Sequence, residues 1–283
     1  ALTVVQPDIG QDRRWDEADA ATRDARMAWL SARIGSAPRL LLWPESGVTD
    51  LLEEDPAARA RLAKLLAPGD LLLTGGIAIV RDRSGNPIAA RNSLFVLGPG
   101  GQILSRYDKA HLVPFGEYLP MRPLLSALGL SRLAPGDLDF APGPGPRSLA
   151  LPGFGTVGVQ VCYEIVFSGH VVDRAGRPRF IFNPSNDAWF GRWGPPQHLA
   201  QARLRAIEEG LPVVRATPTG ISAVIAADGS LRATLGWHQA GRIDAPLPAA
   251  LAPTPFARLG NLLPMLLALA LVAAGFAVRG ERR

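Results

Sequence analysis

The sequence predicts an α/β fold of layered sheets and helices, followed by one apolar helix of membrane-spanning length. Short apolar runs bounded by Gly, Pro, Asn or Asp are typical of strands, and amphipathic stretches between them predict helices at residues 15–34, 56–66 and 198–209. Alternation of the two kinds of element favours a layered α/β architecture. The strands are expected at residues 2–5, 40–43, 71–78, 93–97, 156–161, 180–183, 212–216 and 222–226.

The connecting segments indicate one large domain. Turn-rich residues 81–87 and 98–101 predict hairpin connections within a sheet. Residues 119–147, rich in Pro and Gly, predict an extended loop with a short helix. No internal break divides residues 1–244, which are expected to form a single domain, and the proline-rich residues 245–257 serve as a linker.

The C-terminal segment predicts a membrane span. Residues 259–278 read LGNLLPMLLALALVAAGFAV and contain no ionisable side chain. A run of this length crosses a hydrocarbon core of about 30 Å as a helix, and the alternative, a buried core helix, is disfavoured because no polar face interrupts the run. Arginines flank it, with more after than before, which favours a cytoplasmic tail. We therefore expect residues 258–283 to form a transmembrane helix with a short basic tail.

The first residues enter a predicted core strand directly. Residue Ala1 is followed by LTVVQPDI, without the basic start and cleavage site of a signal peptide. A domain that lies outside the inner membrane needs an upstream segment to export it. We therefore expect that the natural protein has sequence before residue 1.

Composition excludes several classes of function. The net charge of +5 comes mostly from arginines spread along the chain, so no nucleic-acid footprint is present and anionic lipid headgroups are the better partner. The single cysteine excludes an internal disulfide framework and a cysteine-rich metal site. The four histidines lack ligand spacing, so neither a metal nor another cofactor is expected.

Reactive side chains follow three of the apolar strands. Glu45 lies in LLLWPES, Lys109 in YDKAHLVPFGEY and Cys162 in VGVQVCYEIVF. A thiol that attacks a carbonyl must lose its proton, and the resulting oxyanion needs a cation, so a carboxylate base and an ammonium group are chemically coherent partners. A lysine beside the thiol would also lower its pKa. A cysteine at a strand end is by itself more often a core residue, and spacing alone does not bring the three together.

The motifs WPES, YDKAHLVPFGEY and CYEI, in this order, resemble the nitrilase superfamily of carbon–nitrogen hydrolases and, within it, the apolipoprotein N-acyltransferases. The stretches VQPDIGQDRRWD and NPSNDAWFGRWGPPQHLAQARLRAIEEG share this similarity, which covers nearly all of residues 1–279. The resemblance implies a nitrilase-like α-β-β-α sandwich with Glu45 as general base, Lys109 as transition-state stabiliser and Cys162 as nucleophile. It also implies N-terminal membrane helices, which are absent from this chain.

The function implied by the resemblance is acyl transfer in lipoprotein maturation. A phospholipid, typically phosphatidylethanolamine, gives a fatty acyl chain to the cysteine, and the thioester passes it to the N-terminal amine of diacylglyceryl-cysteine in an apolipoprotein. The enzyme would act as a monomer in the bacterial inner membrane, with its catalytic domain on the periplasmic side. The alternative is a membrane-tethered amidase that gives the acyl group to water. The apolar loop 119–134 would dip into lipid and favours the acyltransferase.

Four further positions match residues that the family needs for activity. Glu117 would orient the lysine, or form a structural ion pair. Glu164, two residues after the cysteine, would share its face of a continuing strand, or form a buried salt bridge. Tyr163 would complete an oxyanion hole with its backbone N–H, or only pack. Trp15 would contact the acyl chain or headgroup, or be a core aromatic.

The segment NPSNDAWFG supplies further candidates for substrate contact, Asn186 and Trp189. The alternative for its Asn186 and Asp187 is Asx-turn chemistry that fixes the loop. His198, at the start of a predicted helix, is expected to be structural or headgroup-facing and not a catalytic base.

Overall fold

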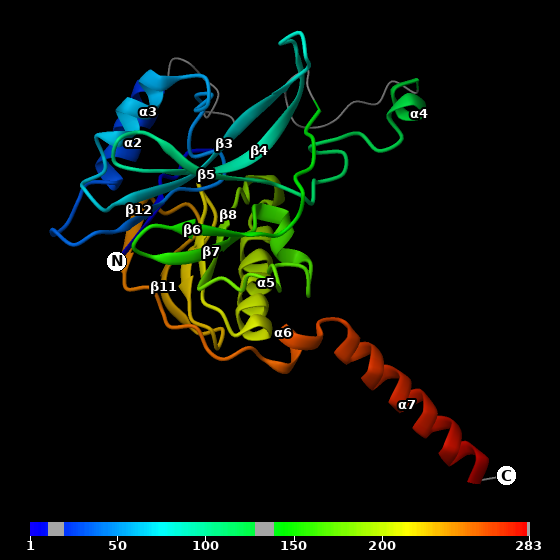
Figure 1. Cartoon of the computed structure of the whole chain (residues 1–283). Coiled ribbons are helices and arrows are strands. Elements are labelled where there is room, and N and C mark those ends of the chain that lie inside the picture. The colour runs from blue at the N-terminus through cyan, green and yellow to red at the C-terminus, as the bar shows by residue number, and fades with distance from the viewer. Residues whose placement is uncertain (11–19, 128–138, 282–283) are drawn as a thin grey trace.

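The computed structural model describes residues 1–10, 20–127 and 139–281, which form two six-stranded sheets with flanking helices (Figure 1). The first sheet contains β1 (Leu2–Gln6), β2 (Leu40–Leu42), β3 (Leu71–Arg81), β4 (Pro87–Leu97), β5 (Ile103–Asp108) and β12 (Gly241–Ala245), in the order β12-β1-β2-β3-β4-β5. The second sheet contains β6 (Ser148–Leu151), β7 (Gly155–Val159), β8 (Phe180–Pro184), β9 (Val213–Ala216), β10 (Ser222–Ile225) and β11 (Leu231–Leu235), in the order β11-β10-β9-β8-β7-β6.

Each sheet combines parallel inner strands with antiparallel outer ones. Strands β1, β2 and β3 run parallel, as do β7, β8 and β9. The hairpins predicted at residues 81–87 and 98–101 are confirmed, because β3 pairs antiparallel with β4 and β4 with β5. Parallel strands that are buried on both faces consist of continuous apolar residues, which explains why the sequence predicted these strands.

Side-chain alternation builds the layers. Leu40 and Leu42 of β2 pack in the core between the two sheets, whereas Leu41 faces the helices outside the first sheet. Phe182 of β8 joins the same central core, and Ile181 packs on the opposite face of the second sheet. The period of two along each strand therefore makes three apolar layers from two sheets.

Helices cover both outer faces, so the expected order of helix, sheet, sheet and helix is confirmed. The outer face of the first sheet packs against Met27 of α2 (Ala20–Leu30) and Ala58 of α3 (Pro56–Ala63), and that of the second against Ala202 of α5 (Gly194–Glu209). Helix α3 begins where the Asp55 carboxylate accepts a hydrogen bond from the Ala58 N–H at 2.8 Å. Helix α5 ends at Gly210, whose φ of 62° suits a residue without a side chain.

The structure contains all eight predicted strands and four that the apolar runs did not reveal. The additional strands are β5, β6, β11 and β12, and each lies at an edge of its sheet. Edge strands have one partner and bury less of their surface, so a strand can form there with few apolar residues, as in LRATL and GRIDA. Local apolarity therefore predicts the interior of a sheet better than its border.

Two predicted features fall partly outside the described residues. The loop expected to dip into lipid contains the short helix α4 (Arg122–Ala127), with Met121 and Leu124 exposed, while Leu119 is buried. Leu125 is half-buried, whereas the apolar positions Leu128 and Leu130 lie outside the described residues, as does Trp15.

The C-terminal apolar segment forms a helix that extends away from the domain (Figure 1). Helix α6 (Pro255–Leu259) ends at Gly260, and α7 (Leu262–Glu281) follows. Large apolar side chains of α7 are exposed, among them Leu267 and Phe276. Within the described residues, no helix has both the length and the apolarity that a membrane crossing requires. The predicted helix is present at this position, but its crossing of a membrane stays a prediction.

Candidate functional site

Glu45 lies in a tight loop directly after β2. Ser46 adopts a positive φ of 48°, an uncommon conformation for a residue with a side chain. Gly75 of β3 passes so close beneath this loop that a Cβ atom there would lie 2.8 Å from the Glu45 Cα. Only glycine allows this approach, and the Gly75 N–H donates to the Pro44 carbonyl at 3.3 Å. The backbone of β3 therefore sets the position of the Glu45 carboxylate.

Lys109, which follows β5, is buried between two carboxylates. Its Nζ atom lies 3.0 Å from Oε1 of Glu117 and 3.6 Å from Oε1 of Glu45, and its side chain is 1% exposed. The Asn92 amide donates to Glu45 at 2.7 Å and to Glu117 at 2.9 Å. Burial lowers the pKa of Lys109, but Glu45 and Glu117 raise it more, so its pKa is raised overall. The ammonium group therefore stays charged inside the domain.

Glu117 is held by its own loop as well as by the lysine. Its second carboxylate oxygen accepts the Val113 N–H at 2.9 Å. Phe115, within the loop, has a positive φ of 62° and donates its N–H to the Tyr118 carbonyl at 2.8 Å. Glu117 therefore forms the expected ion pair with Lys109, and its orienting role in catalysis stays a prediction.

Cys162 begins a short 3-10 helix, η2 (Cys162–Val166), that follows β7. It has a φ of 51°, is 7% exposed, and its Sγ lies 3.8 Å from the Asn186 carbonyl oxygen. Burial and Glu45 raise the pKa of the Cys162 thiol, and the opposing effect of Lys109 is smaller. The expected effect of the lysine is therefore present, but burial and Glu45 outweigh it. A neutral thiol needs a base, and the Glu45 carboxylate is close enough to act on it electrostatically.

The expectation that Glu164 shares a strand face with Cys162 is wrong, and its supporting role stays a prediction. The chain turns into η2 at Cys162, so the two side chains do not share a strand face. Instead, Glu164 accepts hydrogen bonds from the Tyr107 hydroxyl at 2.9 Å and from the Ala110 and Val161 N–H groups at 2.7 and 2.8 Å. Burial raises the pKa of Glu164 against these N–H donors. Glu164 therefore joins the segment after Lys109 to the segment before Cys162, by hydrogen bonds and not by a salt bridge.

The remaining expected site residues surround this centre. The Tyr163 ring packs edge-on against Phe167 at 5.0 Å, and its N–H lies in the first turn of η2, where backbone N–H groups have no intrahelical partner. Asn186 makes the alternative Asx turn, because its side chain accepts the Ala188 N–H at 3.1 Å. Trp189, in η3 (Ala188–Phe190), is 51% exposed.

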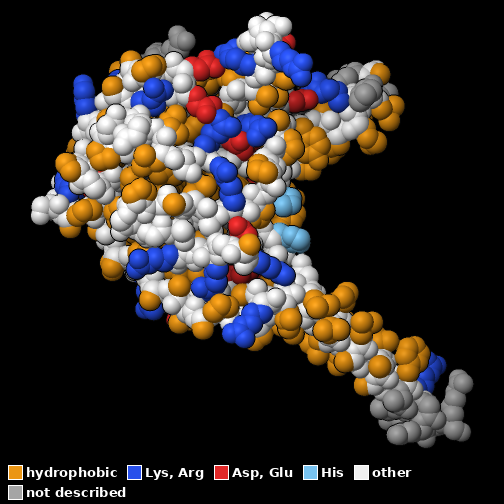
Figure 2. All heavy atoms as spheres, in the orientation of Figure 1, with side chains coloured by type: hydrophobic (Ala, Val, Ile, Leu, Met, Phe, Trp, Pro, Cys, Tyr) orange, Lys and Arg blue, Asp and Glu red, His pale blue; other side chains and the backbone are white. Residues whose placement is uncertain are grey.

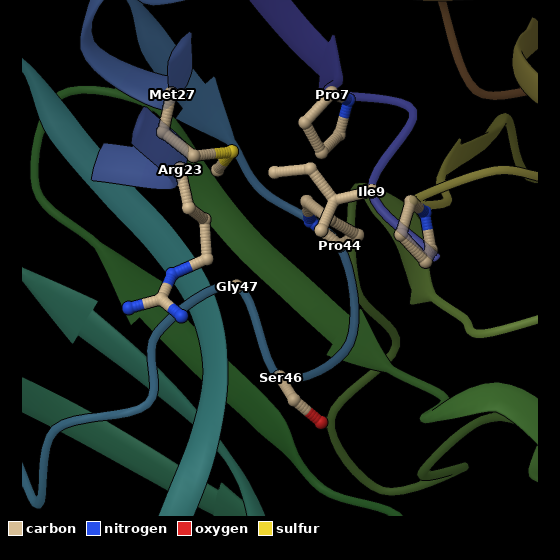
Figure 3. A pocket seen from close by; sticks show the side chains of 8 residues that line it. Pro7, Ile9, Arg23, Met27, Pro44, Ser46 and Gly47 are labelled. Carbon is tan, nitrogen blue, oxygen red and sulfur yellow. The ribbon is translucent and has the colours of Figure 1, made fainter. Parts of the chain in front are cut away.

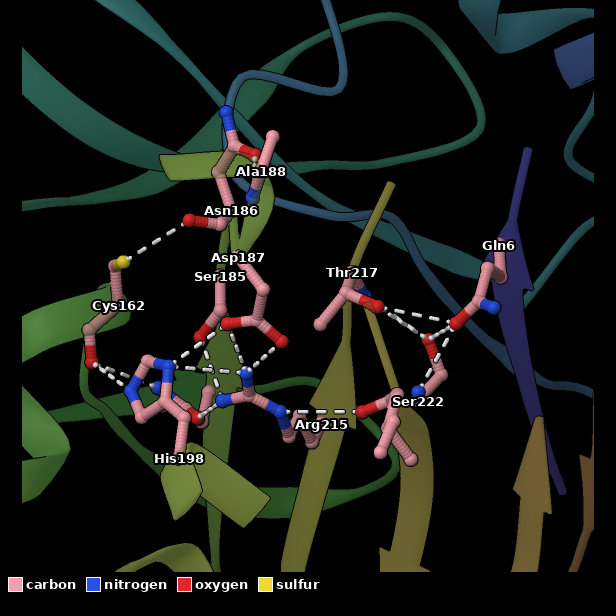
Figure 4. A network of polar contacts seen from close by, with 12 residues as sticks. Gln6, Cys162, Ser185, Asn186, Asp187, Ala188, His198, Arg215, Thr217 and Ser222 are labelled. Atoms are coloured by element: carbon pink, nitrogen blue, oxygen red, sulfur yellow. Dashed lines mark hydrogen bonds and ion pairs between the residues drawn. The ribbon is translucent and has the colours of Figure 1, made fainter. Parts of the chain in front are cut away.

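Two parts of the site were not anticipated from the sequence. Asn92 bridges the two acids, and a buried cluster of Asp187, His198 and Arg215 lies next to Cys162 (Figure 4). Each of these parts had one sign in the sequence, a polar residue at or in an apolar run. Asn92 directly precedes the apolar residues 93–97, and Arg215 lies within residues 212–216. His198 contacts the Cys162 carbonyl oxygen at 3.1 Å and not its sulfur, so a catalytic-base role remains disfavoured.

A small pocket borders the Glu45 loop on its other side (Figure 3). Its lining is mostly apolar, and Arg23 is its charged member. The pocket residues are Pro7, Ile9, Arg23, Met27, Pro44, Ser46, Gly47 and Pro218. Neither Lys109 nor Cys162 lines it, so the reacting groups lie elsewhere. In the part of the chain that the structure describes, no group of three or more His, Cys, Asp or Glu side chains is placed to hold a metal ion.

Comparison with known proteins identifies the family. The pattern of the carbon-nitrogen hydrolase family matches residues 2–255. The chain belongs to this family. Glu45, Lys109 and Cys162 lie within the matched residues.

Curated relatives within the carbon-nitrogen hydrolase family share one name. An apolipoprotein N-acyltransferase from Bradyrhizobium diazoefficiens is 41% identical over 96% of this chain and 53% of its own length. One from Rhodopseudomonas palustris is 40% identical over 92% of this chain and 50% of its own length. The chain therefore spans about half the length of the curated relatives it matches.

Solved structures support the fold of the carbon-nitrogen hydrolases. A superfamily protein from Xanthomonas campestris superposes with a TM-score of 0.59 at 20% identity, covering 94% of this chain and 96% of that chain. A nitrilase-superfamily member from Saccharomyces cerevisiae gives 0.59 at 18% identity, covering 87% and 89%. At these identities the likeness concerns the nitrilase-like two-sheet architecture alone.

The raised pKa of Cys162 predicts how its alkylation depends on pH. The thiolate fraction grows about tenfold per pH unit below the pKa, so the rate of iodoacetamide alkylation should keep rising above pH ~8.5, the ordinary thiol value. Mass spectrometry of the chain between pH 6 and 10 measures this rate, with a cysteine-containing peptide as the unburied control. A plateau below pH 8 would show a resting thiolate and contradict the expectation.

Proposed function

We propose that this domain transfers a fatty acyl chain from a phospholipid, through a thioester on Cys162, to the N-terminal amine of diacylglyceryl-cysteine in apolipoproteins. The observation that carries the proposal is the buried Lys109 held between Glu45 and Glu117, with both Lys109 and Glu45 acting electrostatically on the thiol. This arrangement supplies a base, a cation and a nucleophile for acyl chemistry. The name of the curated relatives, apolipoprotein N-acyltransferase, supports acylation of lipoproteins as its use.

The first half-reaction forms the acyl-enzyme. Glu45 takes the thiol proton as the Cys162 sulfur attacks the ester carbonyl of the phospholipid, and the Lys109 ammonium stabilises the negative oxygen of the tetrahedral intermediate. Collapse of this intermediate breaks the ester bond. The departing alkoxide takes the proton from Glu45, and a lysophospholipid leaves. Because Lys109 is already charged and oriented by Glu117, no reorganisation is needed when the oxyanion develops.

The second half-reaction uses the same groups in reverse. The lipoprotein amine attacks the thioester carbonyl, Lys109 again stabilises the oxyanion, and Glu45 passes the amine proton to the departing Cys162 sulfur. The products are an amide and the free thiol. With water in place of the amine and an amide in place of the ester donor, the same thioester chemistry would make the domain an amidase, which is the second candidate because solved neighbours of this fold include an amidase from Nesterenkonia.

Helix α7 supports a membrane location for this reaction. Figure 2 shows apolar side chains along the length of the projecting helix. Among them, Leu266 is 51% exposed and Leu269 is 60% exposed, which water disfavours and acyl chains would favour. We infer that α7 inserts into the bacterial inner membrane, with the catalytic domain on the periplasmic side and acting as a monomer.

Cys162→Ala tests the thioester. After incubation of the protein with phosphatidylethanolamine, intact mass spectrometry should find a gain of one fatty acyl chain that hydroxylamine removes and that a diacylglyceryl lipopeptide amine accepts. Cys162→Ala should show no acylated species, because the bond to sulfur cannot form. Acylation that persists in this variant would reject the mechanism. An acyl-enzyme that reacts with water but not with the lipopeptide would support the hydrolase instead.

Lys109→Ala tests the stabilising cation. Removal of the ammonium group should lower turnover by about 10²-fold or more, since an oxyanion donor typically contributes that much. Lys64→Ala is the matched control, because Lys64 is exposed at the end of α3 and should leave turnover unchanged. Thermal unfolding of both variants separates lost catalysis from lost folding. Normal turnover by a folded Lys109→Ala protein would exclude the role.

Replacement of Leu266 and Leu269 by glutamate tests insertion of α7. Each charge in the hydrocarbon core costs about 2.5–3.5 kcal/mol. The fraction of the 283-residue protein that floats with vesicles of phosphatidylethanolamine and phosphatidylglycerol should therefore fall sharply. Glutamate at Leu104 and Leu231, which are exposed on edge strands of the domain, is the control and should float normally. Equal flotation of both double variants would contradict insertion of α7.

A further inference from the structure

A buried ion pair lies next to the proposed nucleophile (Figure 4). Nη2 of Arg215 is 2.5 and 2.7 Å from the two carboxylate oxygens of Asp187, and both side chains are 0% exposed. Arg215 also donates to the Asn183 side-chain oxygen and to the Ser185 hydroxyl. A fully buried ion pair contributes little net stability, because desolvation opposes the attraction between the charges. Its position beside the site therefore calls for another explanation.

His198 of α5 connects this ion pair to Cys162. Its Nδ1 lies 2.8 Å from Oδ1 of Asp187, and its Nε2 lies 3.1 Å from the carbonyl oxygen of Cys162. A carbonyl oxygen only accepts hydrogen bonds, so Nε2 carries a hydrogen. Burial and Arg215 lower the pKa of His198 against the effect of Asp187. Nδ1 faces both Oδ1 of Asp187 and Nη2 of Arg215, at 2.8 and 3.1 Å, so the ion pair holds this edge of the ring.

The carbonyl that His198 contacts belongs to a residue in an unfavourable conformation. The φ of 51° at Cys162 costs about 1–2 kcal/mol for a residue with a side chain and persists only where its surroundings impose it. Two donors reach this carbonyl, Nε2 of His198 at 3.1 Å and the Asn183 amide at 3.4 Å. The His198 contact is the shorter, and the ion pair prevents its ring from turning away.

The same ion pair also holds the opposite wall of the site. Asp187 follows Asn186, whose carbonyl oxygen lies 3.8 Å from the Cys162 sulfur. Gly220 packs against Asp187 so closely that a Cβ there would lie 2.8 Å from the carboxylate carbon, which leaves Asp187 no room to move. One buried cluster therefore fixes both the backbone of Cys162 and the carbonyl oxygen beside its thiol.

We propose that His198, backed by Asp187 and Arg215, is a positioning residue that holds Cys162 in its left-handed conformation by donating a hydrogen bond to its carbonyl oxygen. The proposal rests on the proposed role of Cys162 as nucleophile. His198 touches neither the sulfur nor the substrate in this scheme. Its effect reaches the reaction only through the placement of the thiol relative to Glu45 and Lys109.

Two substitutions separate hydrogen bonding from packing. His198→Leu keeps much of the volume and removes the donor, whereas His198→Gln places an amide N–H near the position of Nε2. His238→Leu is the control, because His238 is 54% exposed and pairs with Asp8. The chain of residues 1–283, in detergent micelles, is mixed with increasing concentrations of phosphatidylethanolamine. Intact mass spectrometry follows the formation of acyl-Cys162. Thermal unfolding is recorded for every variant.

His198→Leu should lower the saturating acylation rate by about 10²-fold, the effect of a misplacement of roughly 1 Å, without changing the half-saturating phospholipid concentration. His198→Gln should restore most of the rate, and His238→Leu should match the unsubstituted protein. Equal losses in His198→Leu and His198→Gln, or a rate loss that follows the unfolding temperature, would overturn the positioning role.

If His198→Leu does not fold, His198→Asn takes its place, because its amide nitrogen reaches the position of Nδ1 but not that of Nε2. Slow acylation of Cys162 in His198→Asn and fast acylation in His198→Gln support the proposal, and equal rates in the two variants overturn it. The proposed function fails separately, when the unsubstituted protein forms no acyl-Cys162. Acylation of the unsubstituted protein with no difference among the variants rejects only the role of His198.

Discussion

The site depends on keeping one ammonium group charged inside the domain. Lys109 is almost completely buried, and desolvation of an unpaired cation would cost several kcal/mol. Glu45 and Glu117 offset this cost, and Asn92 donates to both acids, which reduces the repulsion between them. Each of these side chains comes from a different strand or loop. The paired sheet and the loops at its ends therefore have to be in register before the charges can meet.

This charge arrangement also determines the state of the thiol. Burial and, after it, the Glu45 carboxylate raise the pKa of Cys162, and the lysine lowers it by less. The result is a neutral thiol beside a base, in contrast to a site that holds a resting thiolate next to a cation. A neutral thiol is less exposed to adventitious oxidation, and in the proposed mechanism it becomes nucleophilic only when proton transfer to Glu45 accompanies attack. In that mechanism the cation serves the oxyanion rather than the sulfur.

Local patterns in the sequence predicted the inner strands and the positions of Glu45, Lys109 and Cys162, because buried strands are continuous apolar runs and reactive residues follow their ends. The edge strands were missed because their residues are half exposed. Glu164 was misplaced because a positive φ at Cys162, a residue with a side chain, leaves no mark in the sequence. The Asp187–Arg215 pair and the Asn92 bridge were missed because they join residues that only the registers of β4, β8 and β9 bring together.

Transfer to an amine and hydrolysis share one acyl-enzyme, so the difference between them lies in what reaches the thioester. Cys162 is 7% exposed, which already restricts water. The loop that holds Glu117 also exposes Phe115, and the next segment exposes Met121 and Leu124. Phe115 and Met121 lie within four residues of Glu117, whose carboxylate pairs with Lys109. The acyltransferase reading therefore requires no change in the reacting groups, only a lipid surface where a soluble amidase has water.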